Sequence, residues 1–353
     1  MANTHSHSPH SESSSAKQYV IPATGNTVPT NTPSTASART LSLSDSSRLT
    51  QRLIDNVSAA FLGKQDVVTR AALTLISAGH LLLEDVPGLG KTLLAKAIAR
   101  SLSADFKRIQ FTADLLPSDI TGVTVFSQTT NDFQFRPGPV FAHIVLGDEI
   151  NRATPRTQSS LLEAMEEHHV TVDGMVHPLP QPFFVIATQN PVELEGTYPL
   201  PFAQMDRFLL RQSIGYLSRE AEMAMLREQR GLDPLASISP VMTCDELLAI
   251  QDAVSRVQVE ESLLGYLVDI VQATRITEVL EYGASPRGGL DLQRFAQAAA
   301  LLAGRDYVLP DDIKQAARLV LPHRFIVRQG VRSVTLSASS VIDEIVDRIP
   351  VPI

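Results

Sequence analysis

Cysteine is almost absent from this 353-residue chain, which contains only Cys244. One cysteine forms no internal disulfide and provides no patterned set of zinc ligands, so disulfide scaffolds and zinc fingers are excluded. This cysteine usage favours a reducing, intracellular compartment.

Long apolar runs and an excess of positive charge are also missing. No stretch of about 18 apolar residues could cross a bilayer, and the N-terminus lacks the charged and then apolar order of a secretion signal. The net charge is −8, whereas nucleic-acid binders usually show a basic balance or a basic stripe. We therefore expect a cytoplasmic protein with no membrane span and no nucleic-acid partner.

The N-terminal segment has little apolar surface to bury. Residues 1–40 contain 8 Ser and 7 Thr but only three charged side chains. Such a segment cannot offset the entropy cost of becoming ordered. The composition therefore predicts a disordered Ser/Thr-rich tail over residues 1–42.

The rest of the chain is apolar enough to form a sizeable core, since 44% of all residues are hydrophobic. Helical spacing begins near Leu41, and short strand-like runs then alternate with helices. The runs lack strict polar alternation, as expected for strands buried on both faces. They cover residues 80–85, 106–112, 143–149 and 183–190.

This order predicts an α/β fold with a parallel sheet sandwiched by helices. Strand signals fade after about Tyr216, and helical patterns dominate from there to about residue 321. We expect a nucleotide-binding α/β domain over residues 43–216 and a smaller all-α lid domain over residues 217–353.

Two hairpin patterns interrupt the alternation of strands and helices. Residues 169–177, "HVTVDGMVH", place Asp173 and Gly174 between two alternating arms, and this pair suits a tight turn with positive φ at both positions. Residues 123–135 form a weaker pattern with a longer polar tip. The hairpins are either projecting insertions or ordinary sheet extensions.

Residues 81–99, "LLLEDVPGLGKTLLAKAIA", join a strand to a glycine-rich turn and a helix. The glycines let backbone N–H groups surround an anion at the helix N-terminus, the lysine reaches the β- and γ-phosphates, and the threonine hydroxyl suits Mg²⁺. The first position of G-x-x-x-x-G-K-[ST] is Asp85 here, so a chance Gly-Lys turn is the alternative. The predicted nucleotide contacts are Pro87, Gly88, Leu89, Gly90, Lys91, Thr92 and Leu93.

Acidic and amide side chains follow two further strands. "HIVLGDEIN" places Asp148 and Glu149 at a strand end, where Asp148 would order Mg²⁺ together with Thr92 and Glu149 would polarise the attacking water. Adjacent side chains of an extended strand point in opposite directions, so the two carboxylates can divide these tasks. "FFVIATQNP" ends in Asn190, whose amide could hold that water or sense the γ-phosphate. A solvated carboxylate pair and a plain Asn-Pro turn are the alternatives.

These elements, in this order, resemble an AAA+ ATPase. Four segments closely resemble the MoxR family, and with the phosphate loop they stand in the family's order between about residues 45 and 325: "DEINRATPRTQSSLLEAMEE", "ATQNP", "LPFAQMDRF" and "GASPRGGLDLQRFAQAAA". The resemblance implies a ring, usually a hexamer, that binds ATP and Mg²⁺ between subunits. The two hairpins fit AAA+ proteins with insertions in the second helix and before the first sensor.

The resemblance also implies two arginine roles. Arg207 in "MDRF" resembles the arginine finger that completes a neighbour's site, and Arg152 and Arg156 are rivals for an inter-subunit role. Arg287 resembles the second sensor, which reaches from the lid to the γ-phosphate. Read without the resemblance, Arg207 could form an ion pair with Asp206, and Arg287 could satisfy a helix terminus or a nearby carboxylate.

The leading functional hypothesis is an ATP-hydrolysing, chaperone-like remodeller or maturation factor. The resemblance implies a partner with a von Willebrand factor A domain, while the sequence identifies no client protein. The alternatives are a motor subunit of a chelatase-type metal-insertion complex, a nucleic-acid motor and a non-hydrolysing nucleotide-gated scaffold. The hairpin tips "SQTTND" and "DGM" contain no basic residue, which counts against the nucleic-acid motor. A scaffold would need no water-activating carboxylate.

Overall fold

The computed structural model describes residues 41–191, 196–228, 233–328 and 337–352. The predicted disordered tail over residues 1–42 lies almost wholly outside the described residues. Arg39–Ile353 form one compact unit. The division of this unit after residue 216 stays a prediction.

Five parallel strands form the central sheet in the order β2-β5-β8-β1-β9. The four predicted runs all belong to this sheet. β9 was not predicted, because three residues are too few to show a periodic pattern. The strands are β1 Leu81–Glu84, β2 Phe106–Gln110, β5 Ile144–Asp148, β8 Phe184–Gln189 and β9 Leu210–Gln212.

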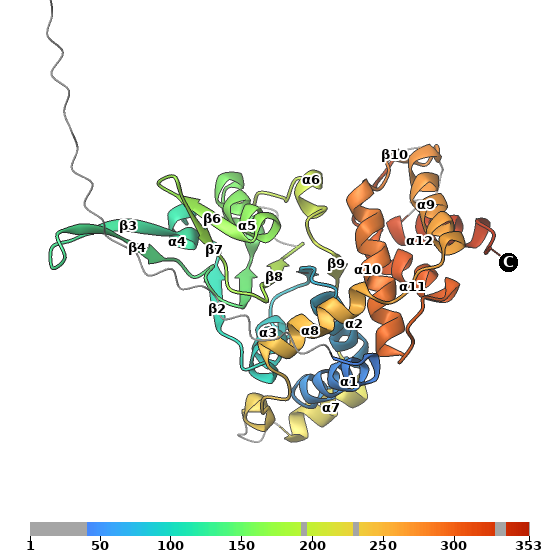
Figure 1. Ribbon diagram of the computed structural model, residues 1–353, viewed down its shortest axis with the longest axis horizontal. Helices are drawn as coiled ribbons and strands as arrows, with labels where there is room; N and C mark the ends of the chain where they lie inside the picture. The colour runs from blue at the N-terminus through green and yellow to red at the C-terminus, as the bar shows by residue number, and fades with distance from the viewer. Residues whose placement is uncertain (1–40, 192–195, 229–232, 329–336, 353) are drawn as a thin grey trace, which may run out of the picture. The chain divides into compact units, whose positions relative to one another are not determined.

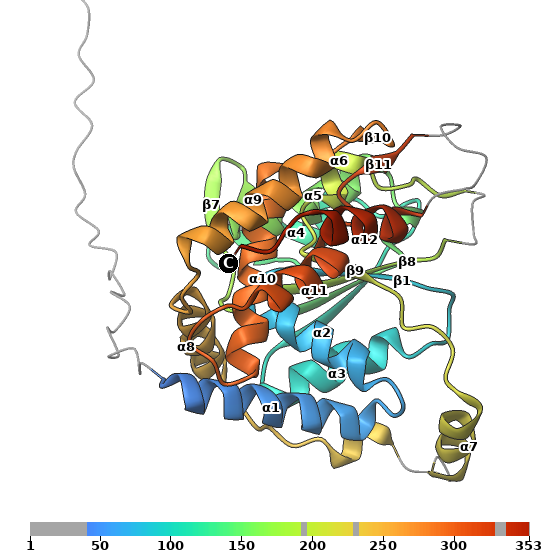
Figure 2. The ribbon, with the colours of Figure 1, turned by 90° about the vertical axis from the view of Figure 1, so that its right-hand side faces the viewer.

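Helices cover both faces of this sheet, which explains why its strands read as continuous apolar runs. Leu81 and Leu83 join one buried cluster, and Leu82 between them joins the other. The first cluster includes α1 (Leu43–Ala60), α2 (Gln65–Ile76) and α3 (Lys91–Ser101), which Figure 2 shows together on one side of β1 and β8. The second includes α5 (Pro155–Glu167).

Both predicted hairpins are present as separate two-stranded sheets. β6 (His169–Val172) and β7 (Met175–Pro178) are joined by Asp173 and Gly174, which both have positive φ as the turn requires. β3 (Gly122–Ser127) and β4 (Asp132–Pro137) form a longer hairpin that extends away from the sheet in Figure 1. The ring of Phe135 stacks on that of His177 at 3.9 Å, so the two hairpins touch.

The C-terminal part of the described chain is mainly helical, and Figure 1 shows its last four helices gathered together. A short antiparallel pair, β10 (Leu280–Tyr282) and β11 (Ile326–Val327), was not predicted. Among the described residues, no helix is both long and apolar enough to span a membrane. The helices of this part are α8 Cys244–Ser255, α9 Glu261–Ile276, α10 Pro286–Leu302, α11 Pro310–Val320 and α12 Ala338–Arg348. The other short helices are α4 Pro117–Thr121, α6 Phe202–Met205 and α7 Arg219–Glu228.

Candidate nucleotide site

The glycine-rich turn between β1 and α3 has the backbone conformation that an anion cradle needs. Gly88 and Gly90 have φ of +89° and +87°, a region that side chains with a Cβ rarely adopt. Gly90 is also the residue before the first turn of α3, whose N–H groups have no helical partner and whose dipole favours an anion. A Cβ at Gly90 would lie 3.0 Å from the ring of Phe61.

Lys91 lies inside this cradle and is largely buried. Its ammonium donates to the backbone oxygen of Asp85, six residues earlier. Burial lowers the pKa of Lys91, and the nearby carboxylates of Asp85, Asp148 and Glu149 oppose that shift. The lysine is therefore a desolvated cation, which binds phosphate more strongly than a hydrated one.

A cavity of about 290 Å³ lies at the carboxyl ends of β1, β5 and β8. This edge of an open α/β sheet is where ligands of such folds bind. The structure brings most of the predicted site residues together here, and it adds Arg108, which was not predicted. The lining residues are Pro87, Gly88, Gly90, Lys91, Thr92, Arg108, Asp148, Glu149 and Asn190.

Asp148 and Glu149 both face this cavity, but the predicted reason is wrong. Glu149 follows the end of β5 and has φ +57°, so the two residues are not neighbours on an extended strand. The Thr188 hydroxyl fixes both residues: it donates to Asp148 Oδ1 at 2.6 Å and accepts from the Glu149 N–H at 2.9 Å. The left-handed turn at Glu149 is what places both carboxylates on one cavity.

The edge strand β2 provides two side chains that contact these carboxylates. Arg108 Nη2 and Nε donate to Asp148 Oδ2 at 2.6 and 3.1 Å. Gln110 Nε2 donates to Glu149 Oε2 at 3.0 Å, and Arg152 Nε lies 3.0 Å from the same oxygen. The sequence predicted a strand over "FKRIQFT" but no site residue in it. Arg108 and Gln110 are two residues apart and therefore lie on the same face of this strand, which is the signal that was missed.

The residues of this cavity fit Mg²⁺ only together with phosphate. The Thr92 hydroxyl and the Asp148 and Glu149 carboxylates are the oxygen ligands that Mg²⁺ prefers. Over the described part of the chain, no group of three or more His, Cys, Asp or Glu side chains could hold a metal ion. Such a sparse donor set is typical of sites where substrate phosphates complete the magnesium shell.

Asp85, which replaces the first glycine of the phosphate-loop pattern, has a structural task. It is 6% exposed. Its carboxylate accepts from Ser213 Oγ at 2.6 Å and from the N–H groups of Ile214 and Gly215 at 2.5 and 3.3 Å. These bonds tie the start of the loop to the segment after β9.

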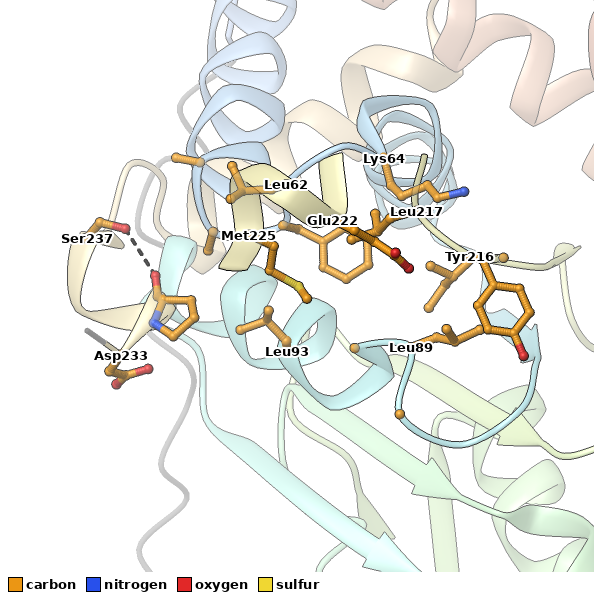
Figure 3. Close-up of a pocket in the computed structure, with 18 of the residues that line it drawn as sticks. Leu62, Lys64, Leu89, Leu93, Tyr216, Leu217, Glu222, Met225, Asp233 and Ser237 are labelled. Atoms are coloured by element: carbon orange, nitrogen blue, oxygen red, sulfur yellow. Dashed lines mark hydrogen bonds between the residues drawn. The ribbon is translucent and has the colours of Figure 1, made fainter. Parts of the chain in front are cut away.

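That segment lines a second, larger cavity of about 530 Å³ (Figure 3). Gly88 and Gly90 border both cavities, so the two adjoin at the loop. The walls are mainly apolar, with Leu62, Leu89 and Leu93 among them, a composition and size suited to a heterocyclic base. This cavity was not predicted, because its walls come from the α1–α2 connection, the loop, the segment after β9, α7 and residues 233–237.

Arg207 and Arg287 do not line either cavity. Both bind Glu166 near the end of α5: Arg207 Nη2 lies 2.9 Å from Oε2, and Arg287 Nη1 lies 2.8 Å from Oε1. α10 begins at Pro286, so Arg287 is in its first turn. Asp206, the alternative partner of Arg207, is instead bound by the buried guanidinium of Arg324, which also binds Asp291.

The two arginines lie where the strands of the sheet begin, whereas the phosphate cavity lies at the carboxyl ends of the strands. Arg207 lies just before the start of β9. Glu166, which binds both arginines, follows Met165. The carbonyl oxygen of Met165 lies 3.2 Å from Nε2 of His80, the residue before β1. Burial lowers the pKa of His80 to about 4, and the nearby Arg287 contributes to that shift. One strand of four residues spans roughly 13 Å, so neither arginine is placed to reach its own chain's phosphate cavity.

The two rival arginines differ in their positions. Arg152 is bound to Glu149 of the same chain, at the edge of the phosphate cavity. Arg156 is exposed in the first turn of α5, after Thr154 and Pro155. Thr154 occupies the position before α5, and Leu161, Leu162 and Met165 of this helix are buried.

Two families match parts of this chain. Residues 80–210 match the ATPase family associated with various cellular activities (AAA), and residues 272–345 match the AAA lid domain. The first match covers β1, β2, β5 and β8 and ends at the first residue of β9, and the second covers parts of the C-terminal helical region.

Individual relatives extend over most of the chain. The uncharacterized protein YeaC of Bacillus subtilis is 47% identical over 302 residues, which cover 86% of this chain and 94% of that protein. The chaperone MoxR1 of Mycobacterium tuberculosis is 40% identical over 311 residues, which cover 86% of this chain and 82% of that protein. A crystal structure of a protein from Cytophaga hutchinsonii, assigned there as an ATPase, has a TM-score of 0.82 and 37% identity, and covers 88% of this chain and 97% of its own.

Proposed function

Because the chain is a nucleotide-binding member of the MoxR-type AAA ATPase family, we propose that it binds ATP with Mg²⁺ and hydrolyses it. The observation that carries this proposal is one cavity that joins the phosphate loop, Lys91, two carboxylates and Asn190. The adjoining apolar cavity would take the adenine base. Hydrolysis distinguishes this function from that of a nucleotide-gated scaffold.

Most residues of the phosphate cavity have a role in this proposal. The loop N–H groups and Lys91 hold the phosphates, while Thr92 and Asp148 would hold Mg²⁺, which supplies charge neutralisation for the transferring phosphoryl group. Glu149 polarises the attacking water, and Asn190 at the end of β8 orients it. The left-handed turn at Glu149 supports this role, because Glu149 lines the same cavity as Lys91 and Thr92.

The position of Arg207 and Arg287 supports catalysis between copies of the chain. Both lie across the sheet from their own cavity, side by side on Glu166. In a ring, a head-to-tail interface would place this edge of one copy against the cavity of the next. We infer that both arginines act on the neighbour's nucleotide, which revises the expectation that Arg287 reaches its own γ-phosphate.

ATP turnover of the wild type and of Glu149→Gln tests the hydrolysis proposal. Without the carboxylate that polarises water, we expect phosphate release to fall by about 10²–10⁴-fold, while nucleotide binding persists. Glu163→Gln is the matched control, since it makes the same change at an exposed position of α5 and should retain wild-type turnover. Equal turnover of wild type and Glu149→Gln would contradict the assignment.

We further propose that hydrolysis drives remodelling of a partner protein. The relative MoxR1 is named a chaperone, and the β3–β4 hairpin of this chain projects with exposed aromatic rings at its outer part. A von Willebrand factor A domain partner, a hexameric ring and a cytoplasmic location belong to the same proposal and follow from the resemblance.

A further inference from the structure

Arg108 lies at the phosphate cavity, and no step of the proposed hydrolysis uses it. Its side chain is 48% exposed and that of Asp148 is 14% exposed. Two of its nitrogens donate to the same oxygen, Oδ2, at 2.6 and 3.1 Å. Arg108 is therefore bound directly to the carboxylate that the proposed function assigns to the metal.

Both oxygens of Asp148 are engaged within the chain. Oδ1 accepts from the Thr188 hydroxyl, and Oδ2 accepts from Nη2 and Nε of Arg108. A hydroxyl group can remain bound when a cation approaches the carboxylate. The guanidinium cannot keep Oδ2 if a divalent ion takes it, because two cations at that distance repel each other strongly in a partly buried site.

The guanidinium is held in this position by a second contact. Arg108 Nη2 also donates to Gln110 Oε1 at 2.6 Å, two residues further along β2. Arg108 lines the same cavity as Lys91 and Thr92, so the ion pair faces the place where phosphates would enter. An ordinary surface ion pair would not share a cavity with the phosphate loop.

We propose that Arg108 is the built-in counter-ion of Asp148, which neutralises this carboxylate before nucleotide arrives and is displaced when Mg²⁺ enters with the phosphates. This inference rests on the proposed ATP site. Arg108 thereby sets the metal dependence of nucleotide binding. It weakens the repulsion between Asp148 and metal-free phosphates, and it competes with the metal for Oδ2.

Calorimetric titration of the non-hydrolysable analogue AMP-PNP tests this inference. The full chain and Arg108→Gln are each titrated once in excess EDTA and once in excess Mg²⁺. Removal of the counter-ion weakens metal-free binding and favours metal-bound binding. We therefore expect the ratio of the Kd in EDTA to the Kd in Mg²⁺ to rise by about fivefold or more over the wild-type ratio.

Three controls separate this effect from a general loss of positive charge. Lys107→Gln removes a charge from the neighbouring exposed position of β2 and should leave the ratio unchanged. Arg108→Lys keeps the charge and should stay near the wild-type ratio. In an Asp148→Asn background the substitution of Arg108 should have no effect on the ratio, because the carboxylate that Arg108 binds is absent.

An unchanged ratio in Arg108→Gln would overturn the inference and leave the nucleotide site intact, since both proteins would still bind AMP-PNP. Loss of binding in both conditions would also overturn it, because Arg108 would then be a phosphate ligand. If the wild type binds no AMP-PNP in Mg²⁺, the proposed function fails and the inference fails with it.

Discussion

Asp85 shows how one side chain can replace a motif residue without loss of the site. Three groups after β9 donate to its buried carboxylate, and its own carbonyl accepts from Lys91. The residue therefore connects the phosphate loop to the wall of the larger cavity. A glycine at this position would complete the sequence pattern but would leave buried N–H groups without an acceptor.

We predict that Asp85→Gly destabilises the protein, although it restores the glycine of the motif. The N–H groups of Ile214 and Gly215 lose their acceptor, and glycine adds backbone entropy to the unfolded chain. The free energy of unfolding should fall by about 2–4 kcal/mol in urea denaturation. Asp85→Asn keeps an acceptor oxygen and should lose less. A glycine variant as stable as the wild type would show that the carboxylate has no structural role.

The β3–β4 hairpin exposes an aromatic side chain on each of its two strands. Phe126 on β3 and Phe133 on β4 are 51% and 68% exposed, with their rings 5.4 Å apart in an edge-to-face arrangement. Phe135 at the base of the same hairpin is instead covered by His177 and Phe141. The base is packed against the protein, whereas the outer pair offers apolar surface for a partner.

We predict that Phe126→Ser combined with Phe133→Ser impairs remodelling but not the ATPase site. Both rings are exposed, so the free energy of unfolding should change by less than about 0.5 kcal/mol per substitution. ATP turnover without a partner should stay within about twofold, while suppression of the aggregation of heat-unfolded citrate synthase should be lost.

Val268→Ser combined with Ile276→Ser is the matched control for this experiment, because it removes two exposed apolar side chains from α9. This control should suppress aggregation as the wild type does. If the hairpin variant also suppresses aggregation normally, the exposed pair does not contact the unfolded protein.

Local patterns were sufficient to predict four of the five strands of the sheet and its ligand edge. The leucine run of β1 is continuous because alternate residues enter different buried clusters, and this feature is visible in the sequence. The Asp173-Gly174 turn was predictable for the same reason, since its backbone demand falls on two adjacent residues. The loop with Lys91 follows β1, and Asp148 ends β5. Because the carboxyl ends of parallel strands meet at one edge of the sheet, the sequence also predicted that these two residues lie close together.

Contacts between distant segments could not be predicted from such patterns. The larger cavity is assembled from five segments, of which only the phosphate loop carries a nucleotide motif. Glu166, Arg207 and Arg287 come from α5, the segment before β9 and α10, and only folding brings them together. The pairing of Arg108 with Asp148 likewise depends on the register of two neighbouring strands.

The whole molecule is an incomplete catalyst in this account. Its phosphate cavity lies at one edge of the sheet, and its arginine pair lies at the other. Each copy in a ring would therefore supply a cavity to one interface and two arginines to the next. Removal of a trans arginine is expected to lower turnover by about 10³–10⁵-fold.

The most direct test mixes two inactive proteins, Glu149→Gln and the double variant Arg207→Ala/Arg287→Ala, in equal amounts and measures ATP turnover after confirmed co-assembly. With both arginines acting on the neighbour, random mixing gives about one interface in four an intact cavity and an intact arginine pair, so roughly a quarter of wild-type turnover should return. A parallel mixture of Glu149→Gln with Lys91→Ala should stay inactive, because both changes affect the same cavity. No recovery in the first mixture would contradict the account, since it would mean that at least one of the two arginines serves its own chain.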